Sequence, residues 1–229
     1  MGNHDYDSGP EGDWEERGDL SWNEFDWQQF LLRQQKEIAR FVTLYDENLD
    51  RLDRLDRAAA EMGWERDDWA VGEGLDEDDD DILSEVREDS LNDADPYTLH
   101  RHPVYVAGAG LFLQLRSLWE IGLGRFPEHF DVQQAWKAAN TLSSIERHLI
   151  LMVQGIDMGD FLLAVCHGKI ALRALNEALQ LLEPLASRGV DAARLADALR
   201  LRLFDLREIC LRVMTDCREE DRRGFRDND

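Results

Sequence analysis

Apolar side chains recur every three or four residues through most of residues 103–217, the spacing that places them on one face of an α-helix. The clearest series is Leu195, Leu199, Leu203, Leu206 and Cys210. This half of the chain is rich in Leu, Ala and Arg, and the whole chain has only five prolines, so its composition favours helices. No stretch of strand length alternates apolar and polar residues. The sequence therefore predicts an all-α fold.

Turn and capping signals divide this pattern into separate helices. We expect long helices at about residues 103–123, 131–155, 160–183 and 191–217, joined by short connectors. An earlier amphipathic helix is predicted within residues 19–63, with its end at Gly63 because glycine commonly follows the last helical turn. Short connectors make consecutive helices antiparallel neighbours. The expected architecture is an antiparallel bundle of four or five long helices, with its core in residues 96–217.

Three other segments differ from this pattern. Residues 1–18 are rich in glycine and acids without periodicity, which predicts a disordered acidic tail. Residues 64–95 are acidic, contain tryptophan and have no sustained helical spacing, so we expect a loop-rich insertion after the first helix. Residues 218–229 form a charged tail. The bundle core is therefore expected to carry acidic or charged segments on both sides.

Three copies of Leu-Asp-Arg occupy residues 49–57, in the middle of the first expected helix. Asp50 lies four residues before Arg54, and Asp53 lies four residues before Arg57. Side chains four residues apart on a helix are neighbours and form ion pairs when their charges are opposite. The repeat predicts two ion pairs on the solvent face of one continuous helix.

Negative charge is concentrated in the first part of the chain. Residues 1–95 carry a net charge of −22, whereas residues 96–229 carry −1. Asymmetry of this kind is typical of an interaction surface. An acidic chain is poorly suited to direct contact with nucleic acid or anionic lipid, because both require a basic face. We therefore expect a basic protein partner, no direct nucleic-acid binding and no membrane binding.

The candidate partner-binding residues lie in residues 64–95. They combine two aromatic side chains that could anchor a partner with a run of acids that could attract it. The set is Trp64, Trp69, Asp76, Glu77, Asp78, Asp79, Asp80 and Asp81. The acid run does not fit a calcium-binding EF-hand loop, since position six of such a loop would be Asp81 instead of glycine.

A metal or cofactor site within the bundle is the alternative hypothesis. Di-metal bundles use Glu-x-x-His, which places both ligands on one helix face, and this chain has no such motif. Four side chains on expected core helices could still meet across the bundle: Glu120, Glu146, His148 and His167. Arg116 lies four residues before Glu120, and we expect the two to pair. If buried, that pair would be an internal functional site, because buried charge must be compensated.

No catalytic signature is present: the chain has neither a Gly-x-Ser-x-Gly elbow nor a nucleotide-binding Gly-x-Gly-x-x-Gly motif. Its three cysteines have no close spacing and are expected to be reduced thiols, as in a cytoplasmic protein. The sequence favours a non-enzymatic interaction protein, which could also pair with a second copy through its long amphipathic helix. The alternative is a metal- or cofactor-binding bundle, for example an oxidoreductase, although no particular cofactor is predicted.

Overall fold

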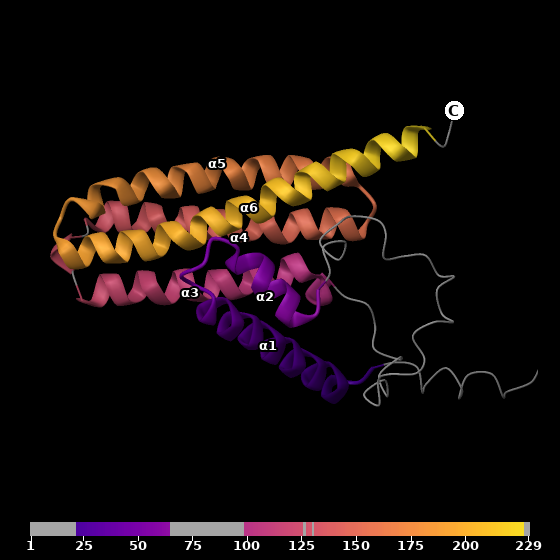
Figure 1. Ribbon diagram of the computed structural model, residues 1–229, viewed down its shortest axis with the longest axis horizontal. Helices are drawn as coiled ribbons and strands as arrows, with labels where there is room; N and C mark the ends of the chain where they lie inside the picture. Colours follow the sequence, from indigo (N-terminus) through magenta and orange to yellow (C-terminus); the bar gives the residue numbers. More distant parts are fainter. Residues whose placement is uncertain (1–21, 65–98, 126, 130, 227–229) are drawn as a thin grey trace, which may run out of the picture. The chain divides into compact units, whose positions relative to one another are not determined.

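The computed structural model describes residues 22–64, 99–125, 127–129 and 131–226 (Figure 1). The chain divides into two compact units, residues 1–36 and 37–229. Helix α1 (Glu24–Glu47) begins in the first unit and ends in the second. The expected disordered tail, residues 1–18, and the acidic insertion from residue 65 onward lie outside the described residues.

In the first unit, α1 begins with a reciprocal cap. The Asn23 side-chain oxygen accepts the backbone N–H of Phe25 at 2.8 Å and of Asp26 at 3.1 Å. The Asp26 carboxylate in turn accepts the Asn23 N–H at 3.1 Å. Such a capping box satisfies N–H groups that have no partner within the helix. Beside it, three aromatic rings meet edge to face with centroids 5.0–5.9 Å apart: Trp22, Trp27 and Phe30.

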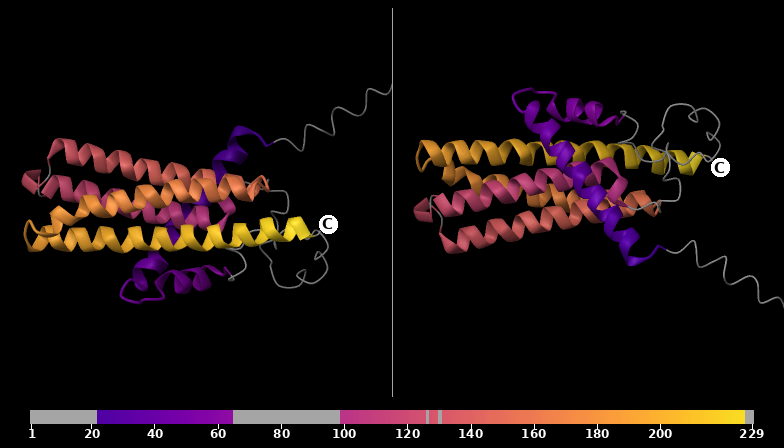
Figure 2. Two further views of the ribbon diagram at one scale, coloured as in Figure 1. Left: turned by 90° about the horizontal axis from the view of Figure 1, so that it is seen from above. Right: turned by 90° about the horizontal axis from the view of Figure 1, so that it is seen from below.

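The second unit is built on four long helices. They are α3 (Pro103–Arg125), α4 (Val132–Asp157), α5 (Phe161–Ala186) and α6 (Val190–Arg226). Helices α4, α5 and α6 follow one another as antiparallel neighbours, and α3 packs on α4 and α6 (Figures 1 and 2). Two short 3-10 turns precede α3 and α4: η4 (Leu99–Arg101) and η5 (Pro127–His129). The predicted all-α antiparallel bundle is confirmed.

The bundle core is formed by the apolar faces that the helical spacing predicted. On α6, Leu199, Leu203 and Leu206 are at most 2% exposed. They pack in one cluster with buried side chains of the neighbouring helices, among them Leu115 and Leu175. Burial of such side chains contributes about 1.5–3 kcal/mol each. The 3–4 spacing is therefore what places the core.

Small residues let the helices approach closely. A Cβ atom built on Gly108 of α3 would lie 2.3 Å from Cδ2 of Leu149 on α4. On Gly155 of α4 it would lie 3.0 Å from the backbone nitrogen of Ala164 on α5. A side chain at Gly108 would force the Leu149 side chain to shift, whereas one at Gly155 would force the Ala164 backbone to move by a few tenths of an ångström. The packing seen is therefore more sensitive to Gly155 than to Gly108.

The single long helix expected over residues 19–63 is wrong. α1 ends at Glu47, residues 48–53 form turns, and α2 (Arg54–Met62) follows. Polar side chains bind across the bend, since Asn48 Nδ2 donates to the Leu44 carbonyl at 3.0 Å and to Glu61 Oε1 at 3.2 Å. α2 therefore folds back on the end of α1 as a helical hairpin.

The end of α2 matches the expectation from its glycine. Gly63 has φ 85°, in the left-handed region that glycine adopts readily. Its N–H reaches the Ala60 carbonyl at 3.0 Å, and the Trp64 N–H reaches the Ala59 carbonyl at 2.9 Å. These bonds satisfy carbonyls that the helix itself leaves without partners.

Within the residues that the structure describes, no helix combines the length and the apolar character needed to cross a membrane.

Candidate functional site

A buried polar network joins α1, α2 and α6. The Arg54 guanidinium binds the Asp205 carboxylate with two hydrogen bonds, Nε to Oδ2 and Nη2 to Oδ1, each 2.6 Å long. The Tyr45 hydroxyl donates to Oδ2 of the same carboxylate. The Arg54 and Asp205 side chains are only 11% and 9% exposed, and Tyr45 is fully buried. Paired in this way, the buried charges are compensated.

Two side chains of this network have raised pKa values. Burial raises the pKa of Tyr45 well above its ordinary value, and the nearby Asp205 carboxylate raises it further. Burial alone would lower the pKa of Arg54, but its hydrogen bonds to Asp205 and Tyr45 raise it. Tyr45 thus remains a proton donor and Arg54 a cation. General acid–base catalysis needs a group that titrates near the working pH, and the raised pKa values of Tyr45 and Arg54 do not meet this requirement. Their observed hydrogen bonds instead join three helices.

Of the two ion pairs predicted within the Leu-Asp-Arg repeat, one is confirmed and the other is wrong. Asp53 accepts a hydrogen bond from Arg57 Nε at 2.8 Å on the surface, as expected. Arg54 does not pair with Asp50 on a solvent face, because its guanidinium is buried against Asp205. The bend at residues 48–53 removes the helical geometry that the predicted pair requires.

A second polar cluster supports the same region. Arg202 Nε of α6 donates to Gln114 Oε1 of α3 at 2.6 Å, and Gln114 Nε2 donates to Asp46 Oδ1 of α1 at 2.9 Å. The Arg202 guanidinium also lies 5.9 Å from the centre of the Tyr45 ring. Cation–π contacts at this distance are attractive. The end of α1 is therefore fixed to two helices of the bundle.

An open groove lies next to the buried network, and Asp205 belongs to both. One side of the groove is formed by the 48–53 turn and the start of α2, and the other side is formed by α6. We call it the α2–α6 groove; its volume is about 340 Å³. Its apolar lining includes Leu52, Phe204 and Leu211, which are 101%, 49% and 40% exposed. Its charged lining consists of Asp53, Asp56, Asp205, Glu208, Arg207 and Arg212. Carboxylates thus outnumber guanidinium groups in the groove.

One of the two arginines in the groove is already engaged. Arg212 binds the Asp56 carboxylate with both terminal nitrogens and donates from Nε to Glu208 Oε1 at 3.0 Å. Hydrogen bonding to Asp56 raises the pKa of Arg212. The groove therefore combines exposed apolar side chains with a charged wall whose carboxylates are each paired with an arginine.

The residues predicted to form an internal site are in different places. Arg116 is 52% exposed and pairs with Glu146 of α4. The predicted pairing of Arg116 with Glu120 on its own helix is therefore wrong. Glu120 is also exposed. The condition for a buried functional pair is not met at Arg116. That condition is met by Arg54 and Asp205, which sequence reasoning assigned to a solvated face or passed over.

Two of the four candidate metal ligands do meet. His148 Nδ1 and His167 Nδ1 lie 3.0 Å apart on α4 and α5, half-buried. Burial lowers the pKa of His148, and the neighbouring Arg147 and His167 lower it further. Glu146 is bound to Arg116, and in the described part of the chain no three His, Cys, Asp or Glu side chains are grouped to hold a metal ion. The two imidazoles are explained by their mutual hydrogen bond.

The predicted partner-binding residues are only partly described. Trp64 stacks on Phe41 of α1, with ring centroids 5.8 Å apart and planes at 20°, and it packs against the core. Its ring therefore closes the helical hairpin, and only its remaining half-exposed surface could reach a partner. Trp69 and the run from Asp76 to Asp81 lie outside the described residues.

The groove residues themselves were not found from the sequence. Phe204 and Leu211 occur in α6 outside the apolar stripe that periodicity assigned to the core, and no role was predicted for them. The sequence contains two signals for this site: α6 has apolar residues in addition to those on its core face, and Asp205 lies beside the buried Leu203 and Leu206. No family model, curated protein or solved structure is similar enough to this chain to count as a match.

Proposed function

We propose that this protein is a non-enzymatic helical interaction protein whose acidic N-terminal part binds a basic protein partner, with the α2–α6 groove as a docking surface. The observation that carries the proposal is the side chain of Leu52, fully exposed at a turn next to exposed Phe204 and Leu211. Single exposed leucines are common, but a cluster of apolar side chains bordered by charge is typical of binding surfaces.

Charge complementarity selects the kind of partner. The carboxylates that line the groove are paired with arginines, so the attraction for a basic partner comes from residues 1–95 as a whole, which carry a net charge of −22. A basic amphipathic segment would place its apolar side chains on Leu52 and Phe204 and its cations near the acids. The acids from Asp76 to Asp81, shortly after α2 in the chain, would speed its approach.

The buried network makes the groove a preformed surface. Arg54 and Asp205 fix the start of α2 to α6, so Leu52 and Phe204 are held near each other before any partner arrives. Preorganisation reduces the ordering cost of binding. The proposed location is the cytoplasm, where the cysteines remain reduced: Cys166, Cys210 and Cys217 are all free thiols.

The first test is site-specific photo-crosslinking in the source cells. A photoreactive phenylalanine analogue replaces Leu52 in the groove or Leu113, which is 56% exposed on α3 and serves as control. We expect a basic protein to crosslink from position 52 and not from position 113. Crosslinks to a second copy of the chain would instead identify a homodimer. Identical products from both positions would refute the docking surface.

The second test measures the role of charge with the partner found by crosslinking. The acids from Asp76 to Asp81 are converted to their amides, and binding is measured at about 0.05 M and 0.5 M salt, where the Debye length falls from about 14 to about 4 Å. We expect slower association for the amide variant and for the parent at high salt. Unchanged association under both conditions would overturn the electrostatic part of the proposal.

The alternative of a metal- or cofactor-binding bundle has a direct measurement. Freshly purified protein is analysed for iron, manganese and zinc. A stoichiometric metal that is lost in a His148→Ala/His167→Ala variant would favour this alternative. Metal-free protein whose melting temperature does not rise with any of the three metals would remove it.

A further inference from the structure

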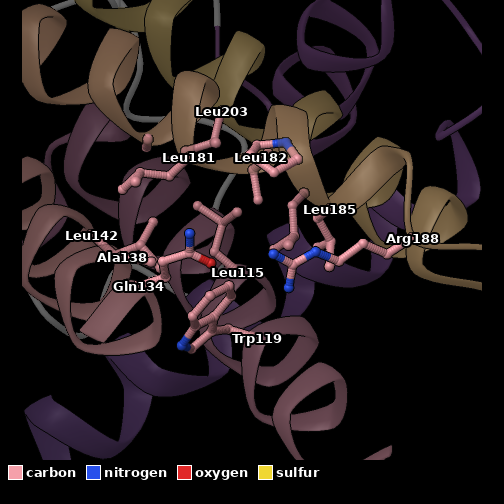
Figure 3. A pocket seen from close by; sticks show the side chains of 13 residues that line it. Leu115, Trp119, Gln134, Ala138, Leu142, Leu181, Leu182, Leu185, Arg188 and Leu203 are labelled. Carbon is pink, nitrogen blue, oxygen red and sulfur yellow. The ribbon is translucent and has the colours of Figure 1, made fainter. Parts of the chain in front are cut away.

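The four bundle helices enclose a narrow apolar pocket at the end where α5 turns into α6. Its lining comes from α3, α4, α5 and α6 and is almost entirely aliphatic (Figure 3). Each helix contributes leucine to the lining: Leu115 from α3, Leu142 from α4, Leu182 from α5 and Leu203 from α6. This pocket is separate from the α2–α6 groove, because the two share no lining residue.

Three of the lining side chains carry polar atoms, and one of them is Trp119 through its indole nitrogen. Gln134 of α4 and Arg188 of the α5–α6 turn belong to the lining, and Figure 3 shows the Arg188 side chain reaching back toward Leu185 and Trp119. The Arg188 guanidinium forms no ion pair with any residue that the structure describes. A cation without a carboxylate partner beside an aliphatic slot is an arrangement suited to an anionic amphiphile.

The size of the pocket restricts the ligand further. The cavity volume is about 40 Å³, room for about three water molecules. A bulky planar cofactor does not fit a cavity of this volume, and an unbranched alkyl chain, which has the smaller cross-section, would enter if the surrounding leucine side chains moved apart. Carboxylates bind guanidinium groups with two parallel hydrogen bonds, which matches the position of Arg188 at the end of the slot.

We propose that this pocket binds a single-chain fatty carboxylate, with the alkyl chain between the bundle helices and the carboxylate on Arg188. The proposal is independent of the protein-docking function, because it rests on a different set of residues. The alkyl chain would be removed from water at the bundle end, and each buried methylene contributes to affinity in proportion to its area. Arg188 would select the charge of the head group.

The test is isothermal titration calorimetry with decanoate, 1-decanol and decyl sulfate, each below its micelle-forming concentration. We expect saturable one-to-one binding of decanoate and weaker binding of the uncharged alcohol. Arg188→Gln should weaken decanoate binding by about three- to tenfold, because a charge-assisted contact at an exposed arginine is lost, and should leave decanol binding unchanged. Decyl sulfate distinguishes a carboxylate site from a general anion site.

Two further variants keep the result decisive. Arg173→Gln removes the same charge from an exposed position of α5 outside the pocket and should not change decanoate binding. Ala138→Leu fills the slot and should abolish binding of both decanoate and decanol, provided that circular dichroism shows unchanged helicity. Absence of saturable decanoate binding to the parent protein, or equal affinities for the parent and Arg188→Gln, would overturn the proposal.

Discussion

Removing the Asp205 carboxylate should cost the second unit much of its stability. In an Asp205→Ala variant, the Arg54 guanidinium loses two hydrogen bonds of 2.6 Å and the Tyr45 hydroxyl loses its acceptor. Both groups are buried, so water replaces the lost carboxylate poorly. Removing one partner of a buried ion pair typically costs about 3–5 kcal/mol. A domain is stable by about 5–15 kcal/mol in total, so the loss is large.

The assay is urea unfolding followed by circular dichroism, combined with hydrogen exchange of the α2 amides. Hydrogen exchange is needed because the helical hairpin could detach while the bundle remains folded. We expect either a lower global free energy of unfolding or much faster exchange throughout α2 (Arg54–Met62). The double variant Arg54→Met/Asp205→Leu should recover most of the loss, because the uncompensated charge is gone.

The surface pair on the same helix provides the control. Asp53→Ala removes the partner of Arg57, whose side chain is 42% exposed, and should change stability little. If Asp205→Ala costs less than about 1 kcal/mol and leaves α2 exchange unchanged, the network does not hold the hairpin, and the preformed groove loses its support.

Three further predictions test the packing and the buried titratable groups. Gly155→Ala should lower the free energy of unfolding by about 1–3 kcal/mol in urea, because the new Cβ would lie 3.0 Å from the Ala164 backbone nitrogen. In the native protein only the exposed Cys166 should react with a thiol reagent at pH 8, because burial raises the pKa of Cys210 and Cys217 to about 12. In urea the burial is lost, and all three cysteines should react. Stability should fall as the pH drops below about 6.5, because burial lowers the pKa of both His102 and His148. The unfolded chain therefore takes up these protons first, and melting temperatures at pH 7.5 and 5.5 measure the loss.

Each of these predictions has its own control. Gly224→Ala adds a Cβ with no atom within 4 Å and should not destabilise the protein. Three fast-reacting thiols in the native state would show that the two buried cysteines are accessible. The ring nitrogen Nδ1 of His102 accepts the Val104 N–H at 3.2 Å, so His102→Asn should keep a cap on α3 and make the pH dependence less steep, with His148 contributing the remainder. An equally steep dependence in that variant would assign the effect to another group.

The helices of the bundle were predictable because their signal is local. The spacing of Leu199, Leu203 and Leu206 determines a helix face whatever the rest of the chain does, and that face is buried as expected. The left-handed glycine at residue 63 was likewise readable as the end of a helix. The candidate site was not predictable in this way, because Phe204 and Leu211 have the same apolar character as residues of the core.

The bend at residues 48–53 shows where local reasoning fails. Three Leu-Asp-Arg triplets satisfy helical spacing and i,i+4 charge pairing, which stabilise a helix by only a few tenths of a kcal/mol for each pair. Burial of Leu55 and Met62 of α2 in the core is worth about 1.5–3 kcal/mol for each side chain, and the Arg54–Asp205 pair forms in the same arrangement of α2 against α6. A stronger tertiary interaction therefore overrides the weaker local preference.

By itself, the sequence determined the helical class, the order and approximate starts of the bundle helices and the concentration of negative charge before residue 96, since each depends on composition or on neighbours within one or two turns. It did not determine where two of these helices end: α5 continues through Pro184 to Ala186, and α6 continues to Arg226 through most of the expected charged tail. Only the tertiary structure decided that Arg54 is buried, that Arg116 pairs with Glu146, and that Leu52 and Phe204 share a groove. Arg54 and Asp205 are 151 positions apart in the chain. Their contact depends on how whole helices are placed against each other, and no local pattern of residues encodes that placement.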